Sequence, residues 1–391
     1  MINLTQLYRE GEWSFPGDAL RYAGRDSAAS VRPVVVWNCT RRCNLRCVHC
    51  YAAGDAETDA PELTTDEAKA LIDDLATFGA PVLLLSGGEP LLRDDLFPLL
   101  RRAADQGLRT VLSTNGTCIT PDAAAKLSAA GVAYVGVSLD AASAARNDAF
   151  RGRDGAFDDA LAGLRACRNA HLRVGLRFTM TRSNLEEIDA LFDLIEREEI
   201  HRVCFYHFTP VGRGRKNAAE APTPEQTRST LDRILARVKT LRRDGQAVEV
   251  LTVGNHSDGP YVYLKLLREE PHRAEKALQL LRRNGGNRSG LAIASVSWDG
   301  AVHPDQFWRR QVVGNIRQTP FSELWSRPAE GSLLAQLRRR RPLLPPRCRS
   351  CRFLDVCNGN LRARAEAAGN GPWGDDPACY LRDEEIRGSE A

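Results

Sequence analysis

Short apolar runs alternate with helix-periodic segments through the first half of the chain. Six runs have the length and composition of buried strands, and they are RPVVVWN (32–38), PVLLLS (81–86), RTVLST (109–114), VAYVGVSL (132–139), RVGLRFTM (173–180) and RVCFYHF (202–208). The segments between them predict helices at Thr64–Phe78, Asp94–Gln106, Pro121–Ala130, Ala156–Ala170 and Leu185–Glu198. Because the strands are apolar almost throughout, the pattern predicts an α/β fold with a parallel sheet, either barrel-like or doubly wound.

Polar or glycine-rich segments follow or end all six predicted strands. In chain order they are NCTRRCNLRCVHC, SGGEP, STNGT, SLD, RFTMT and YHFTPVGRGR. The carboxyl ends of parallel strands meet at one edge of a sheet, and active sites of such folds lie there. We therefore expect these six segments to form one site.

The alternation ends near residue 215. Long helices are predicted at Pro224–Arg243 and Tyr261–Arg283, on either side of EVLTVGNHSDG, and short strands around LAIASVSWDGAVHPD. The pattern divides the chain into a leading segment (1–30), a core (31–215), a helical connecting region (216–289) and a C-terminal domain (290–391).

Composition excludes several classes of protein. With 391 residues, 43% hydrophobic and 27% charged, the chain has the profile of a soluble globular protein. Its net charge of +4 does not indicate nucleic-acid binding. The apolar runs are too short to cross a membrane, and the first residues lack a signal-peptide pattern. We expect a cytoplasmic protein with neither nucleic acid nor membrane as a partner.

Seven of the 11 cysteines form two clusters, and clustered thiols in a reducing compartment more often bind metal than form disulfides. Cys43, Cys47 and Cys50 have the spacing C-x3-C-x2-C. Three thiolates do not complete a tetrahedral zinc site, but they could hold an iron–sulfur cubane with one iron open. Zinc with His49 or Cys39 as fourth ligand is the alternative.

The second cluster comprises Cys348, Cys351, Cys357 and Cys379. Its spacing is C-x2-C-x5-C followed by a distant fourth cysteine. Four thiolates make a closed site, for which zinc would be the usual choice if the cluster stood alone.

The cysteine triad followed one unit later by SGGEP resembles the radical S-adenosylmethionine (SAM) superfamily over the first 215 residues. The resemblance implies a partial (β/α)6 TIM-like barrel, with a [4Fe–4S] cluster on the triad and SAM on its open iron. Reductive cleavage of SAM would then produce a 5′-deoxyadenosyl radical that takes a hydrogen atom from the substrate. The SAM contacts that the resemblance implies are His49, Gly87, Gly88, Glu89, Ser113, Asn115, Ser138, Asp140 and Arg177. A structural ion pair is the alternative role for Arg177.

Behind such a barrel, the second cluster resembles the SPASM/twitch auxiliary-cluster domain. This implies a second [4Fe–4S] cluster, held by the four C-terminal cysteines. The usual cysteine positions of a further cluster are occupied by Asp305 and Leu361. We therefore expect one auxiliary cluster, and whether Asp305 is a ligand stays open.

Longer stretches, among them GAVHPDQFWR and DPACYL, resemble the branch that trims side chains of siroheme-derived tetrapyrroles. That branch includes the haem d1 biosynthesis protein NirJ and the didecarboxysiroheme deacetylase of an alternative haem b pathway. The resemblance implies a tetrapyrrole substrate such as didecarboxysiroheme and a low-potential electron donor such as flavodoxin or ferredoxin, with the haem d1 group slightly closer.

A flat, carboxylate-rich macrocycle that carries iron would need arginine forks and an imidazole around it. The residues expected to contact it are His207, Arg213 and His256. Two other functions remain open, namely a radical SAM enzyme that matures a ribosomal peptide and a non-catalytic zinc-binding module.

Overall fold

One mixed sheet runs through the whole molecule. The computed structural model describes residues 1–9, 15, 17–22, 31–53 and 60–388. Its sheet has the strand order β1-β8-β7-β6-β5-β4-β3-β2-β9-β10-β11. Eight strands are parallel to their neighbours, and they are β2 (Val34–Thr40), β3 (Leu83–Gly87), β4 (Thr110–Thr114), β5 (Val135–Ser138), β6 (Val174–Met180), β7 (Arg202–His207), β8 (Glu249–Val253) and β9 (Ile293–Val296). Antiparallel strands β1 (Ile2–Asn3), β10 (Ala301–His303) and β11 (Gly314–Asn315) complete the ends.

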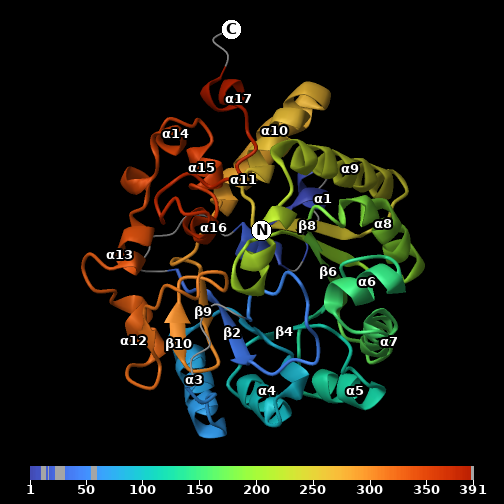
Figure 1. The fold of residues 1–391 in the computed structure, drawn as a ribbon, viewed down its shortest axis with the longest axis vertical. Coiled ribbons are helices and arrows are strands. Elements are labelled where there is room, and N and C mark those ends of the chain that lie inside the picture. Colours follow the sequence, from blue (N-terminus) through green and yellow to red (C-terminus); the bar gives the residue numbers. More distant parts are fainter. Residues whose placement is uncertain (10–14, 16, 23–30, 54–59, 389–391) are drawn as a thin grey trace.

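Helices cover the outside of the parallel strands, as Figure 1 shows for α4, α5, α7 and α8. The barrel helices are α3 (Thr65–Phe78), α4 (Leu96–Asp105), α5 (Pro121–Ala129), α6 (Ala144–Arg151), α7 (Ala156–Asn169) and α8 (Ile188–Arg197). They are followed by α9 (Pro224–Arg243), α10 (Asp258–Glu269) and α11 (Pro271–Asn284). The C-terminal helices, orange to red in Figure 1, are α12 (Phe321–Ser326), α13 (Leu333–Arg338), α14 (Pro346–Arg349), α15 (Leu354–Cys357), α16 (Arg362–Ala367) and α17 (Asp383–Arg387).

The six predicted strands and five predicted helices of the core are all present, so the α/β partial-barrel prediction is confirmed. Local signals account for the accuracy at helix ends. Thr64 and Glu67 form a capping box at the start of α3, and Gly79 ends that helix in the left-handed conformation. A capping box also starts α9: Thr223 pairs with Gln226, and Pro224 occupies the first helical position. The helix begins at the predicted residue.

Two predictions for the connecting region were wrong. The helix predicted at Tyr261–Arg283 is two helices, because Pro271 lacks an N–H and Glu270 before it is extended (φ −141°, ψ 63°). The segment EVLTV, predicted only as a connection, is strand β8, and it pairs with β7 along its length. Strand β9 likewise pairs with β2. The sheet is therefore continuous across residues 215 and 290.

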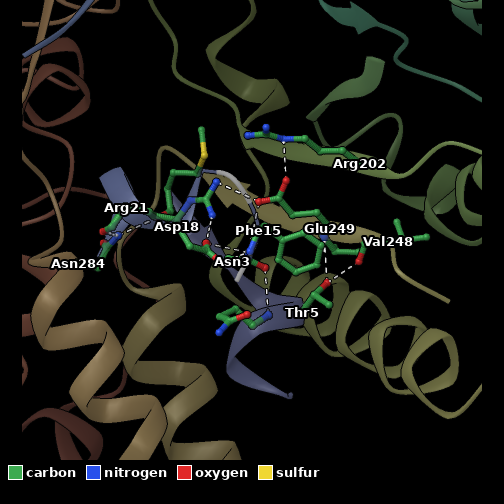
Figure 2. Close-up of polar contacts among 12 residues, drawn as sticks. Asn3, Thr5, Phe15, Asp18, Arg21, Arg202, Val248, Glu249 and Asn284 are labelled. Atoms are coloured by element: carbon green, nitrogen blue, oxygen red, sulfur yellow. Dashed lines mark hydrogen bonds and ion pairs between the residues drawn. The ribbon is translucent and has the colours of Figure 1, made fainter. Parts of the chain in front are cut away.

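The leading segment contributes to the sheet at its amino-terminal edge. Strand β1 pairs with β8, and the short helices α1 (Leu4–Leu7) and α2 (Asp18–Arg21) lie beside it. Figure 2 shows Arg21 between two buried carboxylates, Asp18 and Glu249, with Arg202 on the other oxygen of Glu249 at 3.3 Å. Because Arg202 and Glu249 begin their strands, this network lies at the end of the barrel opposite the cysteine loop.

The described residues contain no helix that is both long and apolar enough to span a lipid bilayer.

Candidate active site

The cysteine loop and the GGE segment are bonded to each other through their backbones. The loop leaves β2, the segment leaves β3, and the amides of Gly88 and Glu89 donate to the carbonyls of Thr40 and Arg42, both at 2.7 Å. A Cβ on Gly88 would lie 2.1 Å from the Arg42 carbonyl oxygen. The glycine is therefore required for contact with the cysteine loop itself, in addition to the contact with a ligand that the sequence suggested.

Two of the three loop sulfurs accept hydrogen bonds that suit thiolates. The Leu45 amide donates to Cys43 Sγ at 3.5 Å, and Arg151 Nη1 donates to Cys47 Sγ at 3.7 Å. Although Cys43 as a residue is exposed, desolvation of its sulfur inside the loop raises its pKa to about 11, and burial raises the pKa of Cys47. A bound metal would be needed to keep both as thiolates near neutral pH.

Cys39, the alternative zinc ligand, lies inside the hydrophobic core and is fully buried, whereas Cys43 is exposed. Burial raises the pKa of Cys39 to about 12. The two sulfurs therefore occupy different environments, and Cys39 has the surroundings of a core residue.

Arg151 connects the cysteine loop to Asp140, which follows strand β5. Its Nη2 is paired with Asp140, whose other oxygen accepts the amide of Thr179 at 2.8 Å. His49 Nε2 lies 3.5 Å from the same carboxylate, and its ring lies 4.8 Å from that of Phe150. Burial lowers the pKa of His49 to about 4, so its ring is neutral. Sequence reasoning missed Arg151, because nothing near residue 151 indicates a partner one hundred residues earlier.

A cavity of about 410 Å³ opens beside this pair. Its wall includes Val48, Asp140, Phe150, Asn184 and Asn217. It therefore adjoins the cysteine loop near His49, which the resemblance implies as a SAM contact.

The carboxylate of Glu89 is fully buried and bonded within the fold. It accepts from Thr114 Oγ1 at 2.7 Å, from the Asn115 amide at 2.8 Å and from the Leu91 amide at 3.2 Å. Burial raises its pKa. The Asn115 side chain in turn donates to Asn44 in the cysteine loop at 2.8 Å. Glu89 and Asn115 thus connect the carboxyl ends of strands β3 and β4.

Arg177 lies among polar and aromatic side chains of the barrel. Its guanidinium donates to Ser113 Oγ and lies 4.7 Å from the centre of the Tyr206 ring. Its strand neighbour on β5 is Ser138. The hydroxyl of Tyr51, directly after the last loop cysteine, donates to Asn38 Oδ1 at 3.1 Å, and it can accept a hydrogen bond from Ser86 Oγ at 2.9 Å. Residues of six neighbouring strands, β2 to β7, therefore lie along the same side of the sheet at their carboxyl ends, and their role in one site remains a prediction.

The C-terminal cysteines also have sulfur-directed donors. The Phe353 amide lies 3.4 Å from Cys351 Sγ, and Arg347 Nη1 lies 3.7 Å from Cys379 Sγ. Burial raises the pKa of Cys348 to about 11 and holds that of Cys357 well above its usual value. Such donors fit an anionic iron–sulfur cluster. Among the described residues, no three histidine, cysteine or acidic side chains are arranged to hold a single metal ion.

Asp305 has protein partners for both carboxylate oxygens. Ser289 Oγ donates to one oxygen, and the Phe307 amide donates to the other at 2.8 Å. Asp305 is 2% exposed, and burial raises its pKa. Leu361 stands at the other position where a further cluster would have a cysteine, and it packs with Trp308. These contacts give both positions structural roles.

Two of the three predicted substrate residues have side chains bonded within the protein, and the ring Nδ1 of the third, His256, has no hydrogen-bond partner among the described residues. His207 Nε2 lies 2.9 Å from Asp258, which also accepts from Tyr380 at 2.8 Å. Arg213 Nη1 donates to the Cys47 carbonyl at 2.8 Å and so supports the cysteine loop. His256 is buried, with its amide donating to Asn360. Their contact with substrate remains a prediction.

Comparison with known proteins agrees with this geometry. Residues 37–195 match the family described as Radical SAM superfamily, and residues 289–352 match the iron–sulfur cluster-binding domain named SPASM. The first match implies a [4Fe–4S] cluster with SAM, and the second implies further iron–sulfur ligation. In fold, the chain aligns with SuiB of Streptococcus suis bound to precursor peptide SuiA, with a TM-score of 0.72 over 96% of this chain and 83% of that chain at 16% identity.

Relatives with higher identity have names from haem metabolism. The chain is 53% identical to Fe-coproporphyrin III synthase of Methanosarcina barkeri, over 100% of both chains. It is 42% identical to pre-heme d1 synthase of Dinoroseobacter shibae, over 91% of this chain and 88% of that protein. This order corrects the expectation that the haem d1 group is closer. The chain belongs to the radical SAM superfamily, and within it to the tetrapyrrole-modifying branch with a C-terminal iron–sulfur domain.

Proposed function

We propose that this enzyme removes acetate side chains from didecarboxysiroheme and so forms Fe-coproporphyrin III. Support comes from the full-length identity of 53% with a Fe-coproporphyrin III synthase. SAM and its cluster, when bound, supply the radical that abstracts hydrogen. We further propose that a low-potential carrier such as flavodoxin or ferredoxin delivers the electron.

The observation that carries the proposal is a recess between the cysteine loop and the C-terminal domain. Its wall combines aromatic and cationic side chains, and they are Tyr51, Phe307, Trp308, Arg215, Arg309 and Arg310. Flat aromatic surfaces and guanidinium forks suit a planar macrocycle with several carboxylates. Phe307 and Trp308 lie two and three residues after Asp305, so the segment that carries Asp305 provides part of the wall.

The wall residues differ in how firmly they are held. Arg309 donates to the Ala52 carbonyl at 2.5 Å and lies 4.1 Å from the Trp298 ring, so it is fixed. Trp308 Nε1 donates to Glu366 at 2.6 Å. Arg310 is exposed, and Arg215 is half-buried. These two are the residues that we propose for binding the carboxylates.

The recess has a volume of only about 20 Å³, far below the several hundred Å³ of an ordinary ligand pocket. A macrocycle would therefore have to displace side chains. Phe307 is half-buried and touches Tyr51 edge-on, with 5.3 Å between ring centres. Rotation of Phe307 would bring a bound ring next to Tyr51 and hence next to the cysteine loop.

Anaerobic titration with didecarboxysiroheme tests the proposal. We expect a shift of the tetrapyrrole bands, 5′-deoxyadenosine formation that depends on the substrate, and a product lighter by two-carbon side chains. Arg310→Gln and Arg215→Gln should each weaken binding about tenfold, or about 1.4 kcal/mol. Arg101→Gln, which removes an exposed arginine from α4 on the barrel exterior, is the matched control.

The products separate the alternatives. Loss or oxidation of propionate with retained acetate would assign the enzyme to the haem d1 route. Absence of both band shift and substrate-dependent SAM cleavage would reject a tetrapyrrole substrate. Peptide maturation would then be favoured, since the chain is also 30% identical to the mycofactocin maturase MftC of Mycolicibacterium smegmatis over 88% of its length.

A further inference from the structure

The run of arginines at 338–341 faces both the protein interior and the solvent. Arg340 is 3% exposed, and its Nε donates to the Leu337 carbonyl at 2.8 Å. Arg338 is half-buried and also donates to a backbone carbonyl, at 3.3 Å. Arg339 and Arg341, on either side of Arg340, are exposed. Packing therefore accounts for the first pair of arginines and leaves the second pair in solvent.

Exposed cations continue from this run to the auxiliary cysteines. Arg349 and Arg352 each follow an auxiliary cysteine directly in the sequence, and both are exposed. Arg349 Nη1 donates to the Pro342 carbonyl at 3.4 Å, so α14 lies against the short 3-10 helix η4 (Arg341–Leu343). Figure 1 shows α13 and α14 at the outer edge of the molecule. The exposed arginines thus lie on adjoining elements at one edge.

An apolar side chain lies within the same surface. Leu343, the last residue of η4, is 40% exposed, which is unusual for a large hydrophobic residue of this protein. Protein interfaces commonly combine an apolar centre with a charged rim. The surface is called the basic face below, and its residues are Arg339, Arg341, Leu343, Arg349 and Arg352.

Carboxylates balance only part of the charge of the basic face. Those around it are Asp355, Asp375, Asp383, Glu384 and Glu385. All but Asp375 are paired with an arginine, in the same order Arg341, Arg347, Arg382 and Arg228. Asp375 is exposed and lies near Cys348. The arginines without a carboxylate partner among the described residues are Arg339, Arg349 and Arg352. The face therefore keeps an excess of positive charge.

The segment of the basic face contacts the auxiliary sulfurs directly. Arg347 Nη1 donates to Cys379 Sγ at 3.7 Å, and the Phe353 amide donates to Cys351 Sγ at 3.4 Å. The auxiliary cysteines are half-buried, so a cluster bound to them would lie close beneath this face. A protein bound to the face would therefore lie over the auxiliary site.

We propose that the basic face is the docking surface for an acidic electron-carrier protein of low potential. Carboxylates of the carrier meet the unbalanced arginines, and an apolar part of its surface covers Leu343. One electron passes from the redox group of the carrier, which is oxidised, to the auxiliary cluster, which is reduced, and no proton or group is transferred. The inference rests on the carrier named in the proposed function and not on the identity of the tetrapyrrole.

The cysteine loop of the barrel offers an alternative docking surface. Its exposed arginines are Arg41, Arg42 and Arg46. Arg42 is paired with Asp94 at 3.3 Å, and the loop exposes no large hydrophobic side chain among its residues 41–50, which the structure describes throughout. The basic face has more unpaired cations together with an apolar centre, and these features favour it.

Anaerobic calorimetric titration of the iron-replete enzyme with a flavodoxin and with a ferredoxin, both of net negative charge, tests the proposal. Joint replacement Arg339→Glu and Arg349→Glu should weaken binding of at least one carrier about tenfold or more at low salt. The difference should shrink at about 0.5 M salt, where charges are screened. Arg101→Glu with Arg197→Glu, on the exposed surfaces of α4 and α8, is the matched control and should change binding less than about twofold. Iron content and the EPR signals after reduction by dithionite establish that each variant is intact.

The outcomes separate the inference from the proposed function. Carrier binding that is unchanged in the Arg339 and Arg349 variant, or that is weakened only by Arg42→Glu with Arg46→Glu, would overturn the basic face and leave the carrier in place. Failure of both carriers to bind the unaltered enzyme would overturn the inference together with the proposed carrier. None of these results depends on the tetrapyrrole.

Hydrogen–deuterium exchange of the unaltered enzyme gives a second test that needs no substitution. Addition of the carrier that binds should slow backbone exchange in residues 339–352. Protection confined to residues 41–50, with none in 339–352, would place the carrier over the barrel loop and reject the inference.

Discussion

Arg151 donates from Nη1 to Cys47 Sγ across 3.7 Å, while its Nη2 is paired with Asp140. One guanidinium, 6% exposed, therefore connects a predicted cluster ligand to a predicted SAM contact. The arrangement balances the charge of Asp140 and directs a donor at a sulfur that must carry negative charge. It also explains why α6, which the sequence did not predict, ends beside the cysteine loop.

Replacement of Arg151 by Gln should destabilise the protein by about 3–5 kcal/mol, because Asp140 is left buried without its partner. The variant should also retain less iron on Cys43, Cys47 and Cys50. Urea unfolding and iron analysis under anaerobic conditions measure the two effects. The double variant with Asp140→Asn is the control and should regain part of the stability, since the unpaired carboxylate is gone. Full stability of the single variant would contradict the pairing.

The iron content should be roughly eight atoms per chain, which corresponds to two cubanes. Combined replacement of Cys43, Cys47 and Cys50 by Ala should leave about four. Four irons in the intact protein, or zinc bound by the C-terminal cysteines, would exclude the auxiliary cluster.

The two clusters should also have separate roles. Cys47→Ala should form no 5′-deoxyadenosine with dithionite, because it removes a ligand of the SAM-cleaving cluster. Cys351→Ala should still form some 5′-deoxyadenosine but should no longer convert the substrate. Equal loss of cleavage in two soluble, folded variants, measured by liquid chromatography, would contradict this division.

Features encoded within a few residues were predictable from the sequence. Helix α9 begins and ends at the predicted residues because Thr223, Pro224 and the apolar spacing determine it locally. The break before Pro271 was also encoded locally, and it was missed because the apolar pattern continues on both sides of the proline. Strand β8 was missed because a run of five residues, beyond the point where the regular strand–helix alternation ends, carries too weak a signal.

Long-range partners could not be predicted. Arg151 and Cys47 are far apart in the sequence, and nothing in the local composition around Arg151 distinguishes it from the many other arginines. The same holds for Arg213, whose bond to the Cys47 carbonyl was not predicted and whose contact with substrate remains a prediction. The expected substrate indicated that guanidinium groups would be needed near the site. Which carboxylate, thiolate or carbonyl each arginine contacts depends on the fold.

Glu249→Gln should destabilise the protein without altering SAM cleavage at a temperature where the variant is folded. Glu249 is buried and pairs with Arg21 and Arg202 at 3.1 and 3.3 Å, so its loss removes the carboxylate of Arg202 and leaves Arg21 with Asp18 alone. The expected cost is about 3–5 kcal/mol. Asp122→Asn, which breaks an exposed pair with Lys126, is the control and should cost less than about 1 kcal/mol. Equal unfolding midpoints for both variants would contradict the role of the network.

His303 on β10 is the clearest source of pH-dependent stability away from the proposed cluster ligands. It is 2% exposed, and its Nδ1 donates to the Gln311 carbonyl at 3.0 Å. Its Nε2 lies 2.8 Å from Ser297 Oγ and accepts the hydroxyl proton when the ring is neutral. The neutral ring therefore satisfies both neighbours, whereas a protonated ring would lose the bond from Ser297.

Burial lowers the pKa of His303 from 6.5 to about 4. Between these values the unfolded chain binds a proton that the folded chain does not, so His303 makes stability rise with pH from 4 to 6.5 and fall on acidification. From pH 7.5 to 5.5 this should cost the protein about 1 kcal/mol. His303→Gln should remove that part of the loss, and replacement of the exposed His272 should not. Anaerobic urea unfolding at the two pH values measures it, and an unchanged pH dependence in His303→Gln would refute the linkage.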